Sequence, residues 1–242
     1  MKVPSIWLRR IHKWVGIAIG LQFLLWAISG TAMALLDMEE VAGGERAEQA
    51  AAPLPPTSPA WPMIQDAVGV NVGAMRSRTV LGRQLLEISG PAGTALIDPA
   101  SGAQVRIGAP LASAIASAAY PGGMAPKSVS KQSEVTLAVR THELPIWKVD
   151  FADRDNSSYY ISGTTGELLE RRNDSWRWWD FFWMLHNMDY AERTSFNHPL
   201  IIAVGIAMAW LAVTGFWLLF RTMWRHDIAW LRSRRRRGTE AG

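Results

Sequence analysis

Two long uncharged runs constrain what this chain can fold into more than any other feature. Residues 15–36 and 199–220 each hold 22 residues without a charged side chain. An α-helix of that length spans about 33 Å at 1.5 Å per residue, enough to cross the hydrocarbon core of a bilayer. Gln22, Ser29 and Thr31 are the only amide or hydroxyl side chains in the first run. The sequence therefore predicts an α-helical membrane protein with two transmembrane helices.

The charges around these runs predict an orientation. Residues 1–14 carry +4 and residues 221–242 carry +5, whereas the whole chain is only +4, so the residues between must carry −5. Because positive charge stays on the cytoplasmic side, we expect both termini in the cytoplasm of a bacterium and residues 37–198 in the periplasm. The basic tail also suits anionic membrane lipid. Since the positive charge adjoins apolar runs, a nucleic-acid partner is not expected.

A secretory signal is the alternative interpretation of the first run. Lys2 and Lys13 precede the apolar stretch, and Thr31-Ala32-Met33-Ala34 resembles a small-residue cleavage site. The run is nevertheless longer than the 7–15 residues typical of a signal core. We therefore expect residues 15–36 to stay as an inner-membrane helix.

The acidic middle of the chain predicts an α+β domain that contains a repeat. A proline-rich linker over residues 37–58 precedes it. The pattern then gives a helix, a strand at 79–88 and a strand pair or bent strand at 94–106. A helix at 111–119 follows, then strands at 134–140 and 146–152, and a segment at 158–171 that contains a turn. The turns Asp98-Pro99-Ala100-Ser101-Gly102 and Ser162-Gly163-Thr164-Thr165-Gly166 resemble each other. We therefore expect two helix–strand–strand units, with the first helix at residues 61–70.

An aromatic segment follows this domain. Asp174 or Ser175 can cap a helix rich in Trp and Phe, which begins the interfacial region of residues 174–198. Such aromatic side chains are typical of the membrane interface, although some of them can instead line a cofactor site.

The sequence excludes several kinds of chemistry. The chain has no cysteine, which rules out disulfides, thiol catalysis, iron–sulfur clusters and haem attached through a C-x-x-C-H motif. It has no nucleotide-binding glycine pattern and no H-E-x-x-H zinc motif. We identify no catalytic residue from the sequence.

Four of the five histidines lie at the predicted membrane boundaries. His12 and His226 lie near the cytoplasmic face, and His186 and His198 lie near the outer face. Imidazoles from different helices are the usual axial ligands of a b-type haem in a helix bundle, so these four side chains are candidate ligands of haem iron. Each of them can equally be an interfacial anchor. The fifth, His142, is expected to be an ordinary surface residue.

Glycine spacing adds a physical reason for a haem site. His12, Gly16 and Gly20 follow one another at intervals of four, which puts them on one stripe of a helix. Glycines one and two turns from a ligand allow a flat porphyrin to approach the backbone. The same spacing, Gly-x-x-x-Gly, is also a helix-packing motif that needs no cofactor.

Several segments together resemble the PepSY-associated transmembrane-helix family. The first helix of that family is similar to Trp7-Leu8-Arg9-Arg10-Ile11-His12-Lys13-Trp14-Val15-Gly16, with Ser29-Gly30 near its end. Its PepSY hairpin resembles Tyr159-Tyr160-Ile161-Ser162-Gly163-Thr164-Thr165-Gly166-Glu167-Leu168-Leu169, and its following helix resembles Leu185-His186, Asn197-His198-Pro199-Leu200 and Thr214-Gly215.

The resemblance implies a function and an assembly. Members of the family include inner-membrane ferric and ferric-siderophore reductases that carry b-type haem between transmembrane helices, and larger members have four such helices and sometimes a fused flavin domain. This chain has two, so the resemblance implies a homodimer with a four-helix core and a separate flavin or quinol electron donor. His12, His186 and His198 carry over as haem ligands, whereas His226 rests on its position alone. The alternative is a haem-free PepSY protein that regulates a peptidase or another membrane partner.

The predicted organisation is therefore a membrane α-helical protein with an extramembrane α+β PepSY-like domain. Its expected segments run in chain order as follows: a basic N-terminus 1–14, a transmembrane helix 15–36, a linker 37–58, the PepSY-like domain 59–173, the aromatic region 174–198, a transmembrane helix 199–220 and a basic tail 221–242.

Overall fold

The computed structural model describes residues 5–44, 73–91, 93–191, 193 and 197–239, with side chains up to Arg221 in the last range. The described chain forms two compact units. The membrane unit comprises helix α1 (Ser5–Leu35), the second half of α5 (Asp174–Asn187) and helix α6 (Pro199–Thr239). The α+β domain comprises Leu36–Asp180.

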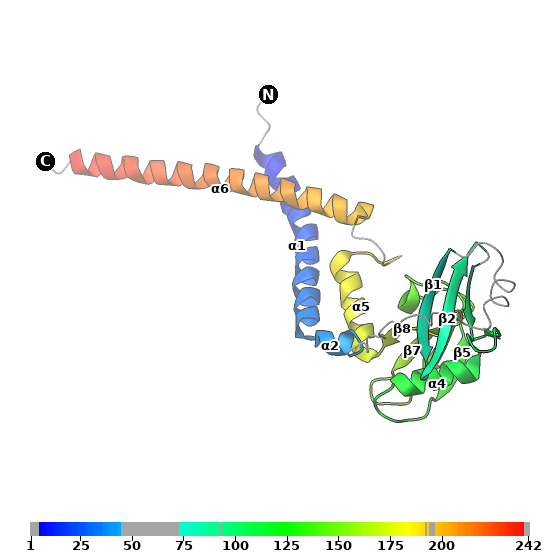
Figure 1. The fold of residues 1–242 in the computed structure, drawn as a ribbon. Helices are drawn as coiled ribbons and strands as arrows, with labels where there is room; N and C mark the ends of the chain where they lie inside the picture. The colour runs from blue at the N-terminus through cyan, green and yellow to red at the C-terminus, as the bar shows by residue number, and fades with distance from the viewer. Residues whose placement is uncertain (1–4, 45–72, 92, 192, 194–196, 240–242) are drawn as a thin grey trace. The chain divides into compact units, whose positions relative to one another are not determined.

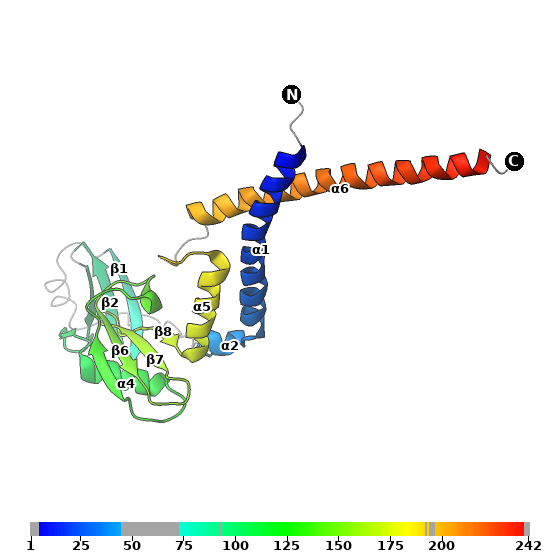
Figure 2. The ribbon, with the colours of Figure 1, turned by 180° about the vertical axis from the view of Figure 1, so that it is seen from behind.

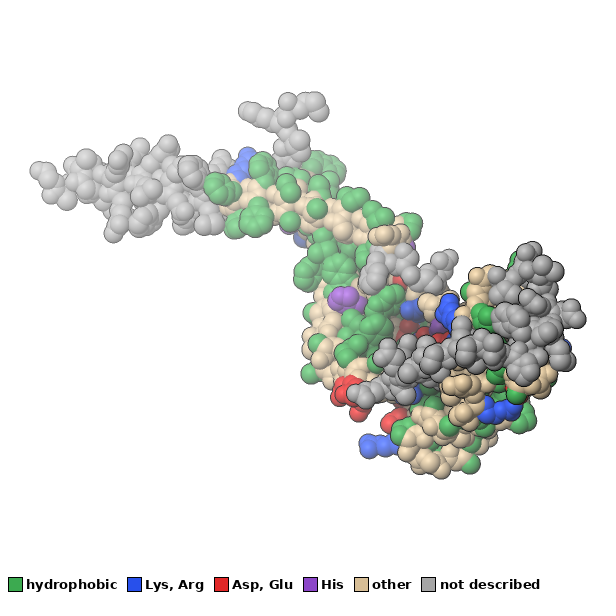
Figure 3. All heavy atoms as spheres, viewed as in Figure 1, with side chains coloured by type: hydrophobic (Ala, Val, Ile, Leu, Met, Phe, Trp, Pro, Cys, Tyr) green, Lys and Arg blue, Asp and Glu red, His purple; other side chains and the backbone are tan. Residues whose placement is uncertain are grey.

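Both predicted transmembrane helices are present. The segments Ile6–Leu35 and Pro199–Arg221 are long and apolar enough to cross a membrane, and only 6% of the most apolar window of each is buried within the protein. The core helix of a soluble protein would be mostly buried, whereas these helices expose many apolar side chains, some of which appear as green patches in Figure 3. Two long apolar helices with little of their surface buried match the length and exposure expected of membrane-spanning helices. The helix α1 begins ten residues before the uncharged run, because Ser5 to Trp14 continue its helical geometry.

The α+β domain contains two antiparallel four-stranded sheets, as Figure 1 shows in cyan and green. The first sheet has the order β1-β2-β3-β4 and the second has the order β5-β6-β7-β8. The strands are β1 (Ala74–Val80), β2 (Arg83–Gly90), β3 (Gly93–Ile97), β4 (Gln104–Val105), β5 (Ser128–Lys131), β6 (Ile146–Asp150), β7 (Ser158–Ser162) and β8 (Leu168–Arg172). The described residues of the domain also form the helices α2 (Met38–Val41) and α4 (Ala109–Ala119) and the 3₁₀ helix η1 (Leu137–Val139).

One core joins the two sheets. The helix α4 buries Ala112, Ile115 and Ala116, and these side chains pack with apolar residues of both sheets. The residues supplied by the sheets and their connections are Val80, Leu85, Leu96, Ile107, Val149, Phe151, Tyr159 and Ile161. The shared core explains why the two sheets form a single compact unit.

The predicted turn repeat is confirmed at the level of hydrogen bonds. The turn between β3 and β4 closes with Gly102 N donating to Asp98 O at 2.8 Å, and the turn between β7 and β8 closes with Gly166 N donating to Ser162 O at 3.0 Å. Both glycines have a positive φ, +71° and +69° respectively, which L-residues rarely adopt. Each turn therefore joins the third and fourth strands of its sheet in the same way.

Three sequence predictions in this domain are wrong. The single strand expected at 79–88 is a hairpin, because Leu81 and Gly82 turn the chain between β1 and β2 with positive φ. The segment 134–140 is not a strand but contains η1, and the strand expected there lies earlier, at β5. The helix α5 is capped by Asn173, whose Oδ1 accepts from Trp176 N at 2.8 Å, and not by Asp174 or Ser175. The helix expected at 61–70 lies outside the described residues.

Candidate functional site

The four boundary histidines occupy different places in the membrane unit. His12 lies in α1, His186 lies in the last turn of α5, and His198 lies directly before α6. His226 lies in α6 beyond Arg221, outside the residues whose side chains the structure describes. The geometry of the site therefore rests on His12, His186 and His198.

His12 joins the two transmembrane helices. Its Nδ1 lies 2.8 Å from Thr214 Oγ1 in α6, and α6 crosses α1 in this region (Figures 1 and 2). The residue after Thr214 is Gly215, where a Cβ atom would lie 3.4 Å from His12 Cε1. The ring of His12 also lies 6.1 Å from that of Trp210, centroid to centroid. The imidazole of α1 thus forms a hydrogen bond with a hydroxyl of α6 and packs against the glycine that follows it.

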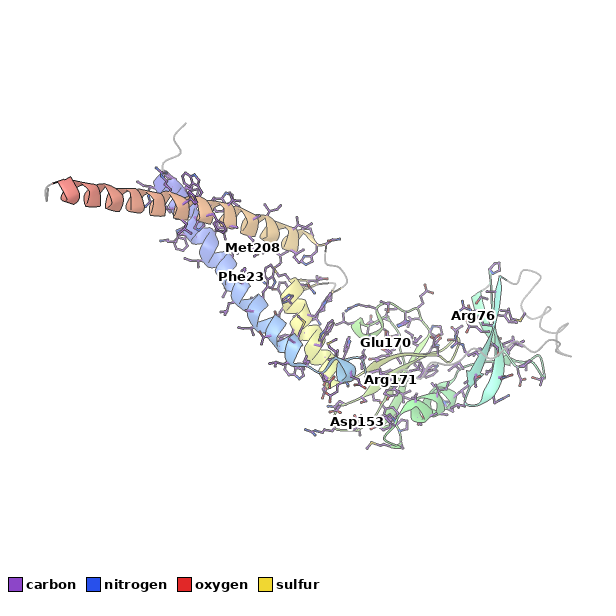
Figure 4. All side chains as sticks on the ribbon, turned by 60° about the vertical axis from the view of Figure 1, so that its left-hand side comes forward. Phe23, Arg76, Asp153, Glu170, Arg171 and Met208 are labelled. Carbon is purple, nitrogen blue, oxygen red and sulfur yellow. The ribbon has the colours of Figure 1, made fainter. Side chains whose placement is uncertain are left out.

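His12 also lines an apolar groove between α1 and α6. The cavity has a volume of about 530 Å³, within the range of about 300–1,000 Å³ that is usual for cofactor sites. Its lining residues are His12, Gly16, Ile19, Gly20, Phe23, Met208, Leu211, Ala212, Gly215, Phe216 and Leu219. Figure 4 labels Phe23 and Met208 on the two helices that form it. The sequence prediction that His12, Gly16 and Gly20 share one stripe is confirmed.

His186 is held by α1 in the same manner as His12 is held by α6. Its Nδ1 lies 3.2 Å from Ser29 Oγ, and Ser29 is completely buried. The next residue is Gly30, where a Cβ atom would lie 3.2 Å from His186 Cε1. The ring of Trp26 lies 6.2 Å from the imidazole. Each of the two histidines therefore contacts a hydroxyl–glycine pair, which is Thr214-Gly215 for His12 and Ser29-Gly30 for His186.

Two buried N–H donors lie one turn apart on α1, and one of them belongs to Trp26, whose ring contacts His186. The Nε2 atom of Gln22 and the Nε1 atom of Trp26 are both buried, and neither has a hydrogen-bond partner among the described residues. A buried donor without a partner costs about 1–3 kcal/mol. A bound group with acceptor oxygens would remove that cost. These two donors of α1 could therefore form hydrogen bonds with such a group.

His198 makes a different kind of contact. Its Nε2 lies 2.7 Å from the backbone carbonyl oxygen of Asn187, at the end of α5. Because a carbonyl only accepts hydrogen bonds, Nε2 must carry the proton and donate it. His198 therefore links the two ends of the loop between α5 and α6 through its Nε2–H group.

His142 belongs to a hydrogen-bond network of the α+β domain. Its Nε2 lies 2.9 Å from Glu170 Oε1, and Glu170 Oε2 accepts from Arg172 at 3.1 Å. Figure 4 labels Glu170 on β8. The arrangement connects the loop after η1 to the edge of the second sheet and is a structural contact.

Sequence reasoning identified the histidines but missed the partners that hold them. Gln22 and Ser29 stood out as polar residues in an apolar run, and Thr214 stands in another. The signal that was available is a hydroxyl followed directly by glycine inside each transmembrane segment. Pairing each of them with a histidine of another helix required the structure.

Comparison with known proteins establishes the family. No curated protein and no solved structure matches the chain. Residues 9–241 match the family described as the PepSY-associated TM region. Because the match includes both transmembrane helices and the domain between them, the chain belongs to the PepSY-associated transmembrane family.

Proposed function

We propose that this protein is an inner-membrane b-haem protein that transfers electrons across the membrane to ferric iron or a ferric chelate in the periplasm. The observation that carries the proposal is the matched setting of His12 and His186, each hydrogen-bonded to a hydroxyl of another helix and packed against the glycine that follows it. The family match supports a location in the membrane. The positive charge at both ends of the chain supports an orientation with both termini in the cytoplasm.

The residues around His12 fit a haem. The groove is apolar, and the absence of a Cβ at Gly20 leaves open space, since nothing lies within 4 Å of the position that atom would take. His12 provides an imidazole nitrogen at one end of this space. On α1, the buried donors of Gln22 and Trp26, which have no partner among the described residues, suit the acceptor oxygens of a propionate, and the Trp26 ring contacts His186.

The chain's own residues supply ligation and a dry environment. His12 and His186 provide neutral imidazoles, with His226 and His198 as the second candidate ligands at the inner and outer faces. Haem bound by these residues would supply one-electron redox chemistry, in which no bond is made or broken. Each electron delivered converts one ferric ion to the ferrous state, which chelators bind more weakly. A separate flavoprotein, reduced flavin or quinol supplies the electron.

A second copy of the chain would complete the bundle. The apolar windows of α1 and α6 are only 6% buried, so most of their surface is free to pack against other helices or lipid. We propose a homodimer with four transmembrane helices at its core. A monomeric mass of the haem-loaded protein in mild detergent would contradict it.

Vesicle reconstitution tests the proposed function. The full-length protein, loaded with haem, is placed in lipid vesicles with a reductant inside and a ferric chelate outside. The proposal predicts ferrous iron outside at a rate well above that of protein-free vesicles, and loss of that rate with haem-free protein. Ferrous iron at only the protein-free rate would overturn it and favour the haem-free interaction protein.

A further inference from the structure

The two hydroxyls beside His12 and His186 do more than pack against them. We propose that Thr214 and Ser29 are positioning residues that hold both imidazoles in the Nδ1–H tautomer, so that the lone pair of each Nε2 is free to ligate iron. The identity of the ligand rests on the proposed function. The tautomer itself can be tested in the protein without haem.

The hydroxyl proton of Thr214 already forms a hydrogen bond within α6. Its Oγ1 lies 2.8 Å from the carbonyl oxygen of Trp210 and 3.2 Å from that of Leu211. Two oxygens at 2.8 Å repel each other unless a proton lies between them, so the hydroxyl donates to its own helix. Only lone pairs of Oγ1 then face His12 Nδ1, which lies 2.8 Å away. The histidine must supply the proton of this hydrogen bond.

The same reasoning applies to Ser29. Its Oγ lies 2.7 Å from the carbonyl oxygen of Leu25 and 3.3 Å from that of Trp26. The hydroxyl is completely buried, so water does not compete for the proton. Oγ therefore accepts at 3.2 Å from Nδ1 of His186. Both α1 and α6 thus contain a hydroxyl that donates a hydrogen bond to its own helix and accepts one from a histidine.

The consequence is a defined state of each ring. A neutral imidazole with its proton on Nδ1 has its lone pair on Nε2, and the hydrogen bond made by one nitrogen selects which nitrogen can bind a metal. His198 provides an internal contrast, because its Nε2 donates to Asn187 O and its lone pair lies on Nδ1. His12 and His186 therefore present Nε2, whereas His198, as a second ligand in this arrangement, would have to present Nδ1.

The hydroxyl also tunes the ligand. Accepting a hydrogen bond from Nδ1–H makes the imidazole a stronger electron donor to iron and favours the ferric state. Loss of the hydroxyl should therefore raise the reduction potential of the affected haem. It should also weaken haem binding about 10-fold to 100-fold, as loss of such a partner does at other metal sites.

The tautomers are measured by NMR of the full-length, haem-free protein in detergent, labelled with ¹⁵N-histidine and recorded where the imidazoles are neutral. His→Gln variants assign the signals. We expect Nδ1–H for His12 and His186 and Nε2–H for His198. Thr214→Val should alter only the signals of His12, and Ser29→Ala only those of His186. Nε2–H signals for His12 and His186 in the wild type, or unchanged signals in both variants, would overturn the inference.

Haem titration and potentiometry provide the second measurement. The variant Thr214→Ser keeps the hydroxyl and serves as the matched control, which should retain wild-type affinity and potential. Thr214→Val and Ser29→Ala should bind haem more weakly, and the haem that they bind should have a higher reduction potential. If the wild type binds haem and these two variants have the same haem affinity and reduction potential, only the positioning role of Thr214 and Ser29 is contradicted. If the wild type binds no haem, the proposed function fails together with the role towards iron, whatever tautomers the NMR experiment finds.

Discussion

Thr214 Oγ1 lies 2.8 Å from His12 Nδ1 and thereby joins α6 to α1, although 202 residues separate them in the chain. Ser29 and His186 repeat the arrangement between α1 and α5 with the chain order reversed, because here the hydroxyl precedes the histidine. In both pairs the following glycine leaves no Cβ to press on the ring. The membrane unit thus contains two similar imidazole sites, and α1 contributes to each.

The groove can be tested with two glycines that have equally open surroundings. A Cβ atom at Gly20 or at Gly205 would meet no atom within 4 Å, but only Gly20 lines the groove. Replacing a helical glycine by alanine stabilises a helix by about 0.5–1 kcal/mol. We therefore expect Gly20→Ala and Gly205→Ala to fold as well as the wild type, with haem affinity lowered only in Gly20→Ala. Haem titration in detergent measures this, and equal affinity of both variants would place the haem elsewhere.

The orientation follows from the positive charge at both ends of the chain. Alkaline phosphatase folds only in the periplasm, so a fusion at Ala52 should be active and a fusion at Gly242 inactive. A cytoplasmic reporter should give the opposite pattern at the same two positions. Activity of phosphatase at Gly242 but not at Ala52 would reverse the predicted topology.

The repeated turn makes a prediction about stability. Gly166 has a φ of +69°, and a Cβ there would lie 3.1 Å from Ile107 Cδ1 and 3.3 Å from Ile115 Cδ1. Gly82 has a φ of +77°, but nothing lies within 4 Å. Gly82→Ala should therefore cost about 1–2 kcal/mol of unfolding free energy from backbone strain alone. Gly166→Ala should cost a further ~1–3 kcal/mol because it overpacks the core. Proteolysis of the full-length protein in urea compares the two, and equal losses would contradict the packing argument.

Asp150 makes the α+β domain sensitive to acid. Burial alone would raise the pKa of this carboxyl, but hydrogen bonds from Lys148 and Ser158 outweigh it and hold the pKa below its ordinary value of 3.8. A lowered pKa stabilises the folded state above pH 3.8, and this contribution is lost as the pH falls through the folded value.

The matching variant removes this charge. Asp150→Asn should cost about 1–2 kcal/mol near neutral pH, where the ionised carboxylate accepts its hydrogen bonds. The difference from the wild type should shrink below pH 3.8. Asp155→Asn, at an exposed position, is the control and should leave the urea midpoint unchanged at both pH values. A deficit of Asp150→Asn that is constant with pH would contradict the linkage.

The parts of the fold that the sequence predicted are those with strong local signals. The uncharged runs and the two glycine turns at Gly102 and Gly166 are set by hydropathy and by backbone conformation, which neighbouring residues encode. The turn at Leu81-Gly82 was missed because leucine rarely adopts a φ of +48° and is not a turn signal. Strand β5 was missed because its sequence Ser-Val-Ser-Lys is mostly polar, and its pairing with β6 determines it.

The candidate site was predicted in part for the same reason. Helical spacing was enough to put His12, Gly16 and Gly20 on one stripe. The contacts with Thr214 and Ser29 join different helices, and helix packing depends on which faces meet in space. A single sequence does not determine those faces, so the partners of the histidines emerged only from the structure.

The absorption spectrum of the purified full-length protein tests the central claim most directly. We expect the Soret and α bands of low-spin, bis-histidine b-type haem in the wild type. Because the ligands lie on different helices, His12→Ala and His186→Ala should each lose part of this absorbance while keeping wild-type helix content by circular dichroism. Absence of haem bands from the wild type, or full haem content in both variants, would contradict it.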